Sequence, residues 1–481
     1  MLNTVYKKVF TENKFFLKFI LCLMMSSSAR AAEAAKATDT DTLPDIVVSG
    51  RGDDLLGIAD SATQGTVGSQ ELETRPLARP GEVLETVPGM IITQHSGAGK
   101  ANQYYLRGFN LDHGTDFATY VDGVPVNLPT HAHGQGYTDL NFLIPELVQG
   151  VTYEKGVYYA DQGDFANAGA AEISYVNTLP TSHMAIAEVG TLGFERVLMA
   201  GSTEFGNGHL LYALEVQHYD GNWDVANDYR KINGVLKYSD GDEKNGRSLA
   251  LEIYSGIWLA NDQVPERAID EGLIDRYGSL DPSVGGSSYR YSLNGEWHKQ
   301  DDDSATKVVV YGVGYGLDLY SDFTYFLNQT QGDEIEQYEH RIYGGVRAKH
   351  TIYGKFLDHD TENTFGFQAR DDEVDPELNQ VTDRVVWQHD RTDHVSELNI
   401  APWYENKIHW SSWFRSVAGV RYDDFNYSDR SDLAGDSGQG NKGALSPKLS
   451  LIFGPWSKTE LYLQKFQPSQ VELQKEPSNK Y

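Results

Sequence analysis

The sequence predicts a small α+β domain followed by an antiparallel β-sheet of the kind that closes into a transmembrane β-barrel. Up to about residue 180, short strand-like runs mix with one helical segment, whereas long alternating segments follow His183, separated by Gly, Asn and Asp turns. These segments keep a period of two over roughly 10 residues, the length that a tilted strand needs to cross a bilayer. Strands of soluble β-sandwiches usually have about 5–6 residues, so the pattern favours a membrane barrel.

The composition excludes two classes of protein. The chain has 40 Lys and Arg against 69 Asp and Glu, a formal net charge of -29 over 481 residues. Nucleic acid is a polyanion and requires a basic surface, so we predict no nucleic-acid partner. The mean hydropathy is negative, which excludes a helical membrane bundle, whereas the alternating strands of a barrel escape hydropathy scans.

The N-terminal segment predicts export from the cytoplasm. Three lysines precede an apolar run over residues 15–25, and an Ala-x-Ala cleavage site follows at residues 29–31. This is the outline of a secretory signal peptide over residues 1–31, too short to span a membrane. The only cysteine, Cys22, lies inside it, so disulfides are not expected in the mature chain.

Residues 32–59 are expected to form a flexible arm, because small and polar side chains dominate its first part. Within the arm, the β-branched run LPDIVVSG at residues 43–50 predicts a short strand. The residues leave two interpretations open. The strand is donated to the sheet edge of another protein by β-augmentation, or it is the first strand of the domain that follows.

Residues 60–180 predict the compact α+β domain. A helical segment begins in RPGEVLETVPGM, where the apolar residues have helical spacing, and Pro88-Gly89 ends it. Five strand-like runs follow, namely MIITQH, QYYLRGF, ATYVDGVPV, VQGVTYEKG and AAEISYVN. In the third run, Asp122-Gly123 stands between β-formers and predicts a hairpin.

Residues 183–481 predict the strands of the barrel. In VVVYGVGYGLDLY, the odd positions from Val309 to Leu319 are large and apolar, whereas the even positions from Gly312 to Asp318 are glycine or aspartate. With spanning strands of about 9–11 residues and a connecting loop after each, the segment has room for about 12–13 strands.

Together these stretches resemble a TonB-dependent outer-membrane receptor of Gram-negative bacteria. DTLPDIVVSG is similar to the TonB box, and VLETVPGM, YYLRGF, VDGVPVN and VTYEKG follow the order of the motifs of the plug domain. LSPKLSLIFGPW is similar to a common pattern of barrel strands. Each motif alone is weak, but their order behind a signal peptide is specific, and the resemblance covers nearly all of the mature sequence.

The resemblance implies a plug inside a 22-stranded barrel in the lipid of the outer membrane. It implies active import of a scarce nutrient, with energy relayed by TonB from its inner-membrane complex, and no required cofactor. The residues that TonB would capture are Pro44, Asp45, Ile46, Val47 and Val48. Arg107 corresponds to an arginine that anchors the plug to the barrel wall. Lys155 stands where a second arginine is usual, and a lysine keeps the charge but loses the bidentate geometry.

Histidines gather in the predicted plug, where four of the 14 in the chain fall between His95 and His133. The resemblance places the tip of the hairpin after VDGVPVN toward incoming ligand. Imidazole and carboxylate together suit zinc, copper or nickel. The expected ligand contacts are His113, His131, His133 and Tyr137. We expect His131 and His133 as metal ligands, with zinc, copper or an iron chelate as cargo; alternatively, this loop only forms hydrogen bonds within the plug.

A metallo-hydrolase interpretation of the two loop histidines fails on the residues that follow them. A His-x-His-x-Asp-His site requires Asp and His where the chain has Gln135 and Gly136. The sequence also has no nucleophile elbow, P-loop or paired-cysteine motif, so we predict that the chain is not an enzyme.

The chain departs from the family in its number of strands. About 12–13 strands would close into a barrel too narrow for a plug, because barrel diameter grows with strand number. The final stretch QPSQVELQKEPSNKY is polar and does not alternate. We therefore expect a partial barrel, from a frameshift, a truncation or a fragment, that another chain completes or that does not transport. The alternative function is a non-transporting remnant whose plug only binds ligand or TonB.

Overall fold

The computed structural model describes residues 51–467 apart from 53–54, 78, 95 and 326. The predicted signal peptide, the strand at residues 43–50 and His95 therefore lie outside the described residues. Within the described ranges, no helix is long and apolar enough to cross a membrane.

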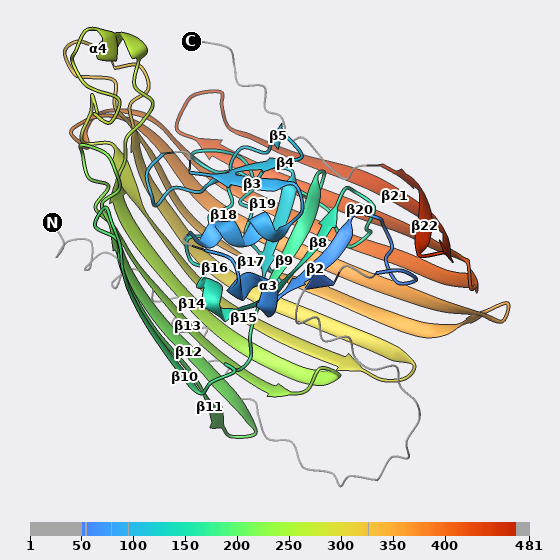
Figure 1. Ribbon diagram of the computed structural model, residues 1–481. Helices are drawn as coiled ribbons and strands as arrows, with labels where there is room; N and C mark the ends of the chain where they lie inside the picture. The colour runs from blue at the N-terminus through green and yellow to red at the C-terminus, as the bar shows by residue number, and fades with distance from the viewer. Residues whose placement is uncertain (1–50, 53–54, 78, 95, 326, 468–481) are drawn as a thin grey trace. The chain divides into compact units, whose positions relative to one another are not determined.

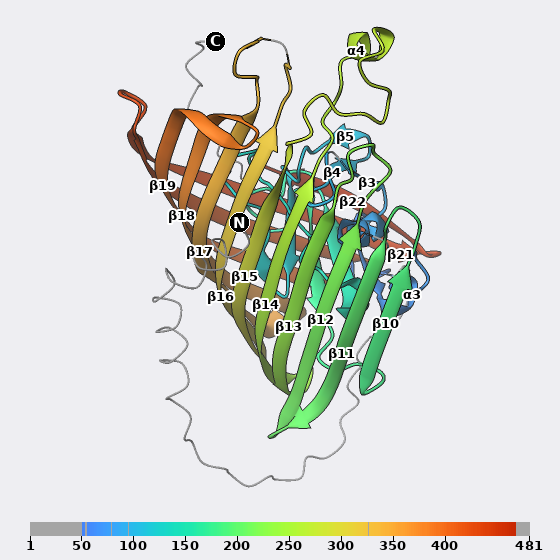
Figure 2. The ribbon, with the colours of Figure 1, turned by 90° about the vertical axis from the view of Figure 1, so that its left-hand side faces the viewer.

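Thirteen antiparallel strands form one large curved sheet in chain order, and this agrees with the predicted number and with the predicted fold class (Figures 1 and 2). The end strands β10 and β22 each have one neighbour among the described residues, so the sheet does not close on itself there. The strands are β10 (His183–Val189), β11 (Glu195–Phe205), β12 (Gly208–Tyr219), β13 (Tyr229–Gly241), β14 (Asn245–Leu259), β15 (Gly285–Gln300), β16 (Ser304–Ser321), β17 (Ile335–Phe356), β18 (His359–Thr382), β19 (Val385–Ser411), β20 (Phe414–Ser431), β21 (Gly438–Trp456) and β22 (Thr459–Phe466).

Many strands are longer than the roughly 10 residues that crossing a bilayer requires. Strand β10 has 7 residues, whereas β19 has 27. In an antiparallel pair the ladder continues for as long as both strands stay extended and offer partners. The β17–β18 ladder accordingly runs without interruption down to the tight turn between Phe356 and His359. Strand length in this sheet therefore follows the extent of hairpin pairing and exceeds what a bilayer crossing requires.

The two faces of the sheet differ, and the difference changes along it. In β13, Ile232 and Leu236 are exposed on the outer face, whereas Asn233 and Lys237 are buried on the inner face. In β16 the apolar odd positions from Val309 to Leu319 are instead buried and belong to one hydrophobic cluster with residues of the first domain. The alternation in β16 thus marks the face that packs inward.

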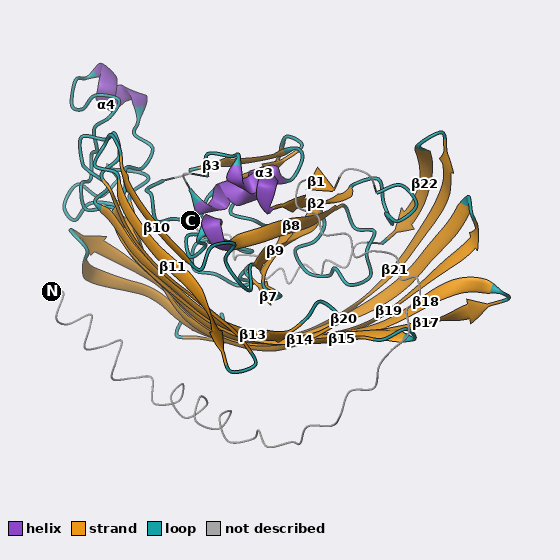
Figure 3. Ribbon diagram, turned by 60° about the horizontal axis from the view of Figure 1, so that its bottom comes forward, coloured by secondary structure: helices purple, strands orange, loops and turns teal. Residues whose placement is uncertain are grey.

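The first domain lies against the concave face of the large sheet (Figure 3). It has a six-stranded sheet of order β1-β2-β8-β9-β6-β7 and a three-stranded sheet of order β3-β4-β5. All five predicted strand-like runs form strands. The elements are β1 (Arg51–Gly52), β2 (Gln64–Gly68), α3 (Ser69–Glu73), η1 (Pro80–Thr86), β3 (Met90–Thr93), β4 (Gln103–Leu106), β5 (Phe109–Asn110), β6 (Phe117–Val121), β7 (Val124–Pro125), η2 (Pro145–Leu147), β8 (Val148–Lys155) and β9 (Gly169–Tyr175). A short helix α4 (Glu266–Asp270) lies in the long connection between β14 and β15.

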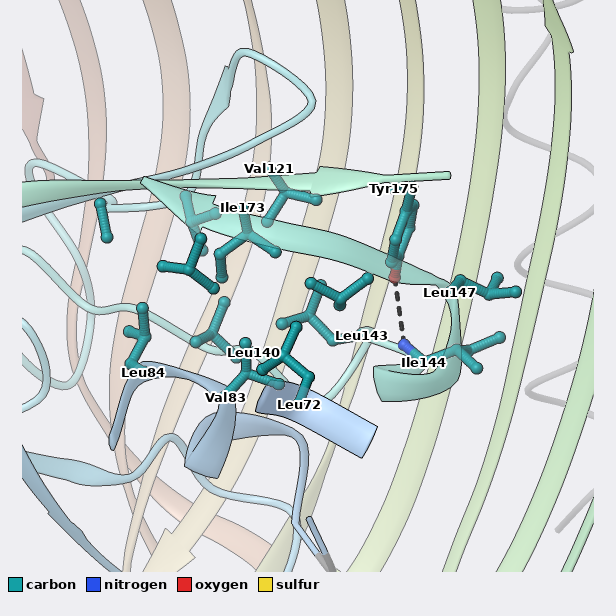
Figure 4. Packing of buried hydrophobic residues seen from close by; sticks show 14 of the residues in the cluster. Leu72, Val83, Leu84, Val121, Leu140, Leu143, Ile144, Leu147, Ile173 and Tyr175 are labelled. Carbon is teal, nitrogen blue, oxygen red and sulfur yellow. Dashed lines mark hydrogen bonds between the residues drawn. The ribbon is translucent and has the colours of Figure 1, made fainter. Parts of the chain in front are cut away.

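The core of the first domain forms where α3 and η1 cover one face of the six-stranded sheet (Figure 4). Leu72 of α3, Val83 of η1 and Ile173 of β9 belong to the same buried cluster. Each such aliphatic side chain contributes about 1.5–3 kcal/mol when it leaves water. The Ile144 amide donates a hydrogen bond of 3.1 Å to the Tyr175 hydroxyl, which satisfies both groups inside this core.

The predicted hairpin joins β6 to β7. Asp122 and Gly123 have φ angles of 46° and 79°, as a turn with two left-handed residues requires. The chain after β7 is fixed by Asn127, which is buried. Its side-chain amide donates to the carbonyls of Gly114 and Phe117, each at 3.0 Å, and its oxygen accepts from the Thr119 amide at 2.7 Å.

Replacing Asn127 by alanine is expected to destabilise the first domain. The substitution removes three side-chain hydrogen bonds to buried backbone groups, each of which contributes about 0.5–1.5 kcal/mol, so we expect a loss of about 2–4 kcal/mol. Urea unfolding of the full chain in detergent micelles, followed by tryptophan fluorescence, measures the difference. Asn441→Ala on the exposed face of β21 is the control. Equal stability of the two variants would contradict the assignment.

Candidate functional site

Charged groups of the large sheet hold the first domain in place. Lys237 of β13 lies 2.9 Å from the Asp122 carboxylate and donates to the Tyr175 carbonyl at 3.1 Å. Both charges of this pair are buried. A buried ammonium requires both a counter-charge and hydrogen-bond acceptors; the turn between β6 and β7 supplies the carboxylate, and the end of β9 supplies the carbonyl.

A second cation contacts the same hairpin turn. Arg347 of β17 donates to the Gly123 carbonyl and to the Glu172 carboxylate, each at 3.1 Å. Its guanidinium lies over the Tyr120 ring, 3.9 Å from the centroid. The hairpin turn is therefore clamped between two basic residues of the sheet.

Further contacts repeat one pattern, in which a basic residue of the sheet meets a carboxylate or a carbonyl of the first domain. The pairs are Arg196–Glu146, Lys407–Asp60, Arg370–Asn127, Arg415–Ala59 and Lys448–Val157. Sequence reasoning missed these residues. The signal that could have found them is a basic residue on the inward-facing alternate positions of a barrel strand, such as Lys231 and Lys237 in β13.

The two predicted anchoring residues lie elsewhere. Arg107 is exposed on the turn after β4, has a φ of 53°, and donates its backbone amide to the Gly89 carbonyl at 2.8 Å. Lys155 is buried and donates to the Pro88 carbonyl at 3.0 Å, within the same domain. Within the described residues, Arg107 forms no ion pair with the sheet. The anchoring role of both residues stays a prediction.

We expect Lys237→Met to loosen the first domain from the sheet. Removal of the ammonium leaves the Asp122 carboxylate buried without its cation, which costs about 3–5 kcal/mol. The double variant with Asp122→Asn is expected to recover part of the loss. The measurement is urea unfolding of the full chain in micelles, together with protease accessibility of the first domain.

Arg247→Met is the matched control for Lys237→Met, because Arg247 forms an exposed pair with Asp240. Such a pair contributes about 0–1 kcal/mol. A cost for Lys237→Met no larger than that of the control would contradict the anchoring role of Lys237.

The histidine loop, residues 128–137, follows β7 and is closed by a bridge between Leu128 and Tyr137. The sheet fixes its conformation. Glu397 accepts from the Thr130 hydroxyl at 2.6 Å, and Glu339 accepts from the Ala132 amide at 2.7 Å. The loop is thus oriented by carboxylates of β17 and β19 rather than by the first domain alone.

His131 is buried in this loop and is stacked on Tyr137, with ring centroids 4.1 Å apart and planes 10° from parallel. Its Nδ1 accepts from the amides of His133 and Gly134, at 3.2 and 3.4 Å. Its Nε2 lies 3.4 Å from the Tyr315 hydroxyl. Burial first, and then the nearby Arg341, hold the pKa of His131 well below its usual range, so the imidazole is neutral.

The ring of His133 meets that of His113. The two Nε2 atoms lie 3.3 Å apart, and the ring centroids 5.0 Å. Tyr137 contacts both rings, with centroid distances of 5.4 Å to His113 and 6.0 Å to His133. Its hydroxyl accepts from the Ala101 amide at 2.9 Å, and burial raises its pKa, so it stays protonated. The structure therefore brings all four predicted ligand-contacting residues together.

Another group of potential ligands lies at the ends of β12 and β13. The ligand atoms of His218, Asp220 and Asp228 all lie within 4.8 Å of one another. Asp228 is already paired with Arg230 at 2.7 Å, and all three side chains are partly solvated. Because a cation competes there with the guanidinium, this group is a weaker candidate for a metal.

Two neighbouring cavities lie between the first domain and the sheet, with volumes of about 100 and 340 Å³. The smaller is lined by Pro129 and Gln135 of the histidine loop, and Tyr120 and Arg347 line both. A water molecule takes about 30 Å³ in the liquid, so the larger cavity has room for several waters or a hydrated ion. Burial raises the pKa of Asp164, at the smaller cavity, to about 7.

Comparison with known proteins identifies the fold of this arrangement. Residues 58–170 match the TonB-dependent Receptor Plug Domain. The unliganded ferric citrate transporter FecA superposes with a TM-score of 0.68 at 14% identity, over 83% of this chain and 61% of that one. The copper transporter OprC superposes with a TM-score of 0.65 at 16% identity, over 87% of this chain and 64% of that one. The ferric-catecholate import receptor Fiu from E. coli K12, in its open form, superposes with a TM-score of 0.69 at 13% identity, over 87% of this chain and 72% of that one.

The first domain is therefore a plug domain, and the large sheet has the fold of the barrel of TonB-dependent receptors. The chain has the fold of these receptors, in which the plug comes first in the sequence and the barrel strands follow. It spans less than two thirds of the length of FecA and of OprC.

Proposed function

We propose that this chain acts in TonB-dependent active import of a scarce nutrient across the outer membrane of a Gram-negative bacterium. A metal ion or a metal chelate is the proposed cargo. The observation that carries the proposal is a plug domain seated on barrel strands through buried polar contacts, with a cluster of histidines at the same interface. Two proteins of the same fold are named as transporters of ferric citrate and of copper.

The position of the plug edge suggests how TonB would act. Among the described residues, strand β1 (Arg51–Gly52) pairs with β2 alone and lies at the edge of the six-stranded sheet. It directly follows the proposed TonB-binding segment, residues 43–50. A pull on that segment would load the two-residue β1–β2 ladder first and then β2, so the plug would yield from this edge inward.

The polar interface provides the path that such a movement would widen. Around two cavities that share Tyr120 and Arg347, plug and sheet meet through ion pairs and hydrogen bonds, whereas the contact with β16 is apolar. Polar contacts can exchange for water as the plug shifts, whereas an apolar interface would resist hydration. The cargo would enter at the histidine loop and pass along these cavities.

The proposed partners are TonB with its inner-membrane complex, outer-membrane lipid and a small metal-containing ligand. The outer face of the sheet supports the lipid contact, because large apolar side chains such as Met199, Leu214, Leu236 and Ile253 are exposed there. The matched structures are named as transporters and receptors, which supports the prediction that the chain is not an enzyme.

Ile46→Pro is expected to abolish uptake while surface binding persists, because proline interrupts the strand that TonB would pair with. The measurement is accumulation of radioactive zinc, copper or ferric citrate by cells that express the chain and lack competing uptake systems. Deletion of TonB should reproduce the defect, and Ala37→Pro, outside residues 43–50, is the control.

Uptake that survives both Ile46→Pro and loss of TonB would contradict the proposed mechanism. Binding without uptake in the unaltered chain would instead favour the alternative function, a plug that only binds ligand or TonB.

A further inference from the structure

In the contact between His113 and His133, the two imidazole rings meet nitrogen to nitrogen. The two imidazoles approach each other through Nε2, at 3.3 Å. Which nitrogen of each ring carries the proton decides what this contact is. The partners of the two Nδ1 atoms settle that question.

In His113 the proton lies on Nδ1. This atom lies 3.1 Å from each of the carbonyl oxygens of Ala101 and Asn102. A carbonyl oxygen only accepts hydrogen bonds, so Nδ1 must donate. In the neutral ring, Nε2 then carries the lone pair, and it points at His133.

In His133 the proton also lies on Nδ1. This atom lies 2.8 Å from Oε1 of Gln337. The nitrogen and oxygen of the Gln337 side-chain amide cannot be exchanged without losing a hydrogen bond, because Nε2 donates to the Ala132 carbonyl at 2.8 Å. Oε1 accepts only, so Nδ1 of His133 donates, and its Nε2 lone pair faces that of His113.

Two lone pairs that face each other repel, and a cation between them converts the repulsion into two bonds. Zinc binds imidazole nitrogen at about 2.0–2.1 Å in a tetrahedral arrangement, which sets two such nitrogens about 3.3–3.4 Å apart. The observed 3.3 Å is this separation. Nδ1–H groups held by oxygen acceptors are also the usual outer contacts of metal-bound histidines.

A carboxylate lies beside the pair. Asp112 Oδ1 is 3.8 Å from Nε2 of His113, and the Asp112 side chain is 56% exposed. It can turn toward a bound ion and supply a third ligand and a negative charge, while its exposure leaves a side open for water. His113 itself is buried, so one ligand is rigid and one side of the site is accessible.

We propose that Nε2 of His113 and Nε2 of His133, with Asp112 as third ligand, bind a single divalent transition-metal ion of the zinc or copper type. His131 is a positioning residue in this site. Its Nδ1 accepts the amide of His133, and its ring stacks on Tyr137, so it orients the loop that carries His133. Gln337 positions the ring of His133 from the barrel strand β17.

This inference rests on the proposed function and narrows its cargo to a bare divalent ion. The site also ties the ion to both parts of the molecule. His113 belongs to the plug, and His133 is oriented by Gln337 of the sheet. Movement of the plug away from β17 would break the contact between His133 Nδ1 and Gln337 and so lower the affinity for the ion. The pull of TonB on the plug would therefore be coupled to release of the ion.

The test is titration of the purified full chain, stripped of metal in detergent micelles, with Zn²⁺ by calorimetry and with Co²⁺ by visible absorption. We expect one ion per chain. His113→Gln and His133→Gln should each lower affinity more than about 100-fold, because loss of a direct ligand exceeds the about 10–100-fold cost of losing a supporting contact. Gln337→Ala and His131→Gln should each lower the affinity by about 10–100-fold, and His218→Gln should leave the affinity unchanged.

A second measurement does not depend on any variant folding. Electron paramagnetic resonance of Cu²⁺ bound to the unaltered chain should show coupling to two imidazole nitrogens, and labelling of Nε2 should alter it. Absence of binding, coupling to no histidine, or loss of binding in His131→Gln but not in His113→Gln would overturn the proposal.

The uptake assay separates the two proposals. No Zn²⁺ or Cu²⁺ binding together with persistent uptake of ferric citrate overturns this site and leaves the import function in place. Tight binding without TonB-dependent uptake leaves the site in place and overturns import.

Discussion

The buried ion pairs between plug and sheet are the constraint on which the rest of the structure depends. The inner face of the first barrel strands carries charges such as Lys237 and Arg196. Charges on a buried face are stable only with partners of opposite sign and with acceptors for their remaining protons. The plug supplies Asp122, Glu146 and several backbone carbonyls. Sheet and plug therefore satisfy groups that neither could bury alone.

The same contacts set the geometry of the histidine cluster. The hairpin clamped by Lys237 and Arg347 leads directly into the loop of His131 and His133. Carboxylates and an amide of β17 and β19 then fix the loop through the Thr130 hydroxyl and the backbone of Ala132. The position of the histidines is a consequence of how the plug is seated, and a shift of the plug would alter both together.

Local features of the plug could be predicted, and some features of the sheet could not. The hairpin at Asp122-Gly123 and the strand runs follow from turn chemistry and from period-two patterning, which depend on neighbours in the chain. The inward orientation of the apolar positions of β16 was not predictable, because an alternating pattern does not tell which face meets lipid. That choice is made by the apolar plug residues, such as Val124 and Tyr137, that pack against β16.

The sequence by itself determined the order of the two parts, the count of barrel strands and the concentration of histidines near one hairpin. These follow from local periodicity and composition. Only the tertiary structure decided which histidines meet. His131 and His133 are neighbours in the chain but turn to different partners, whereas His113, from a separate loop, meets His133. The reason is that ring orientation is set by hydrogen-bond partners far away in the sequence, among them Gln337 of the barrel.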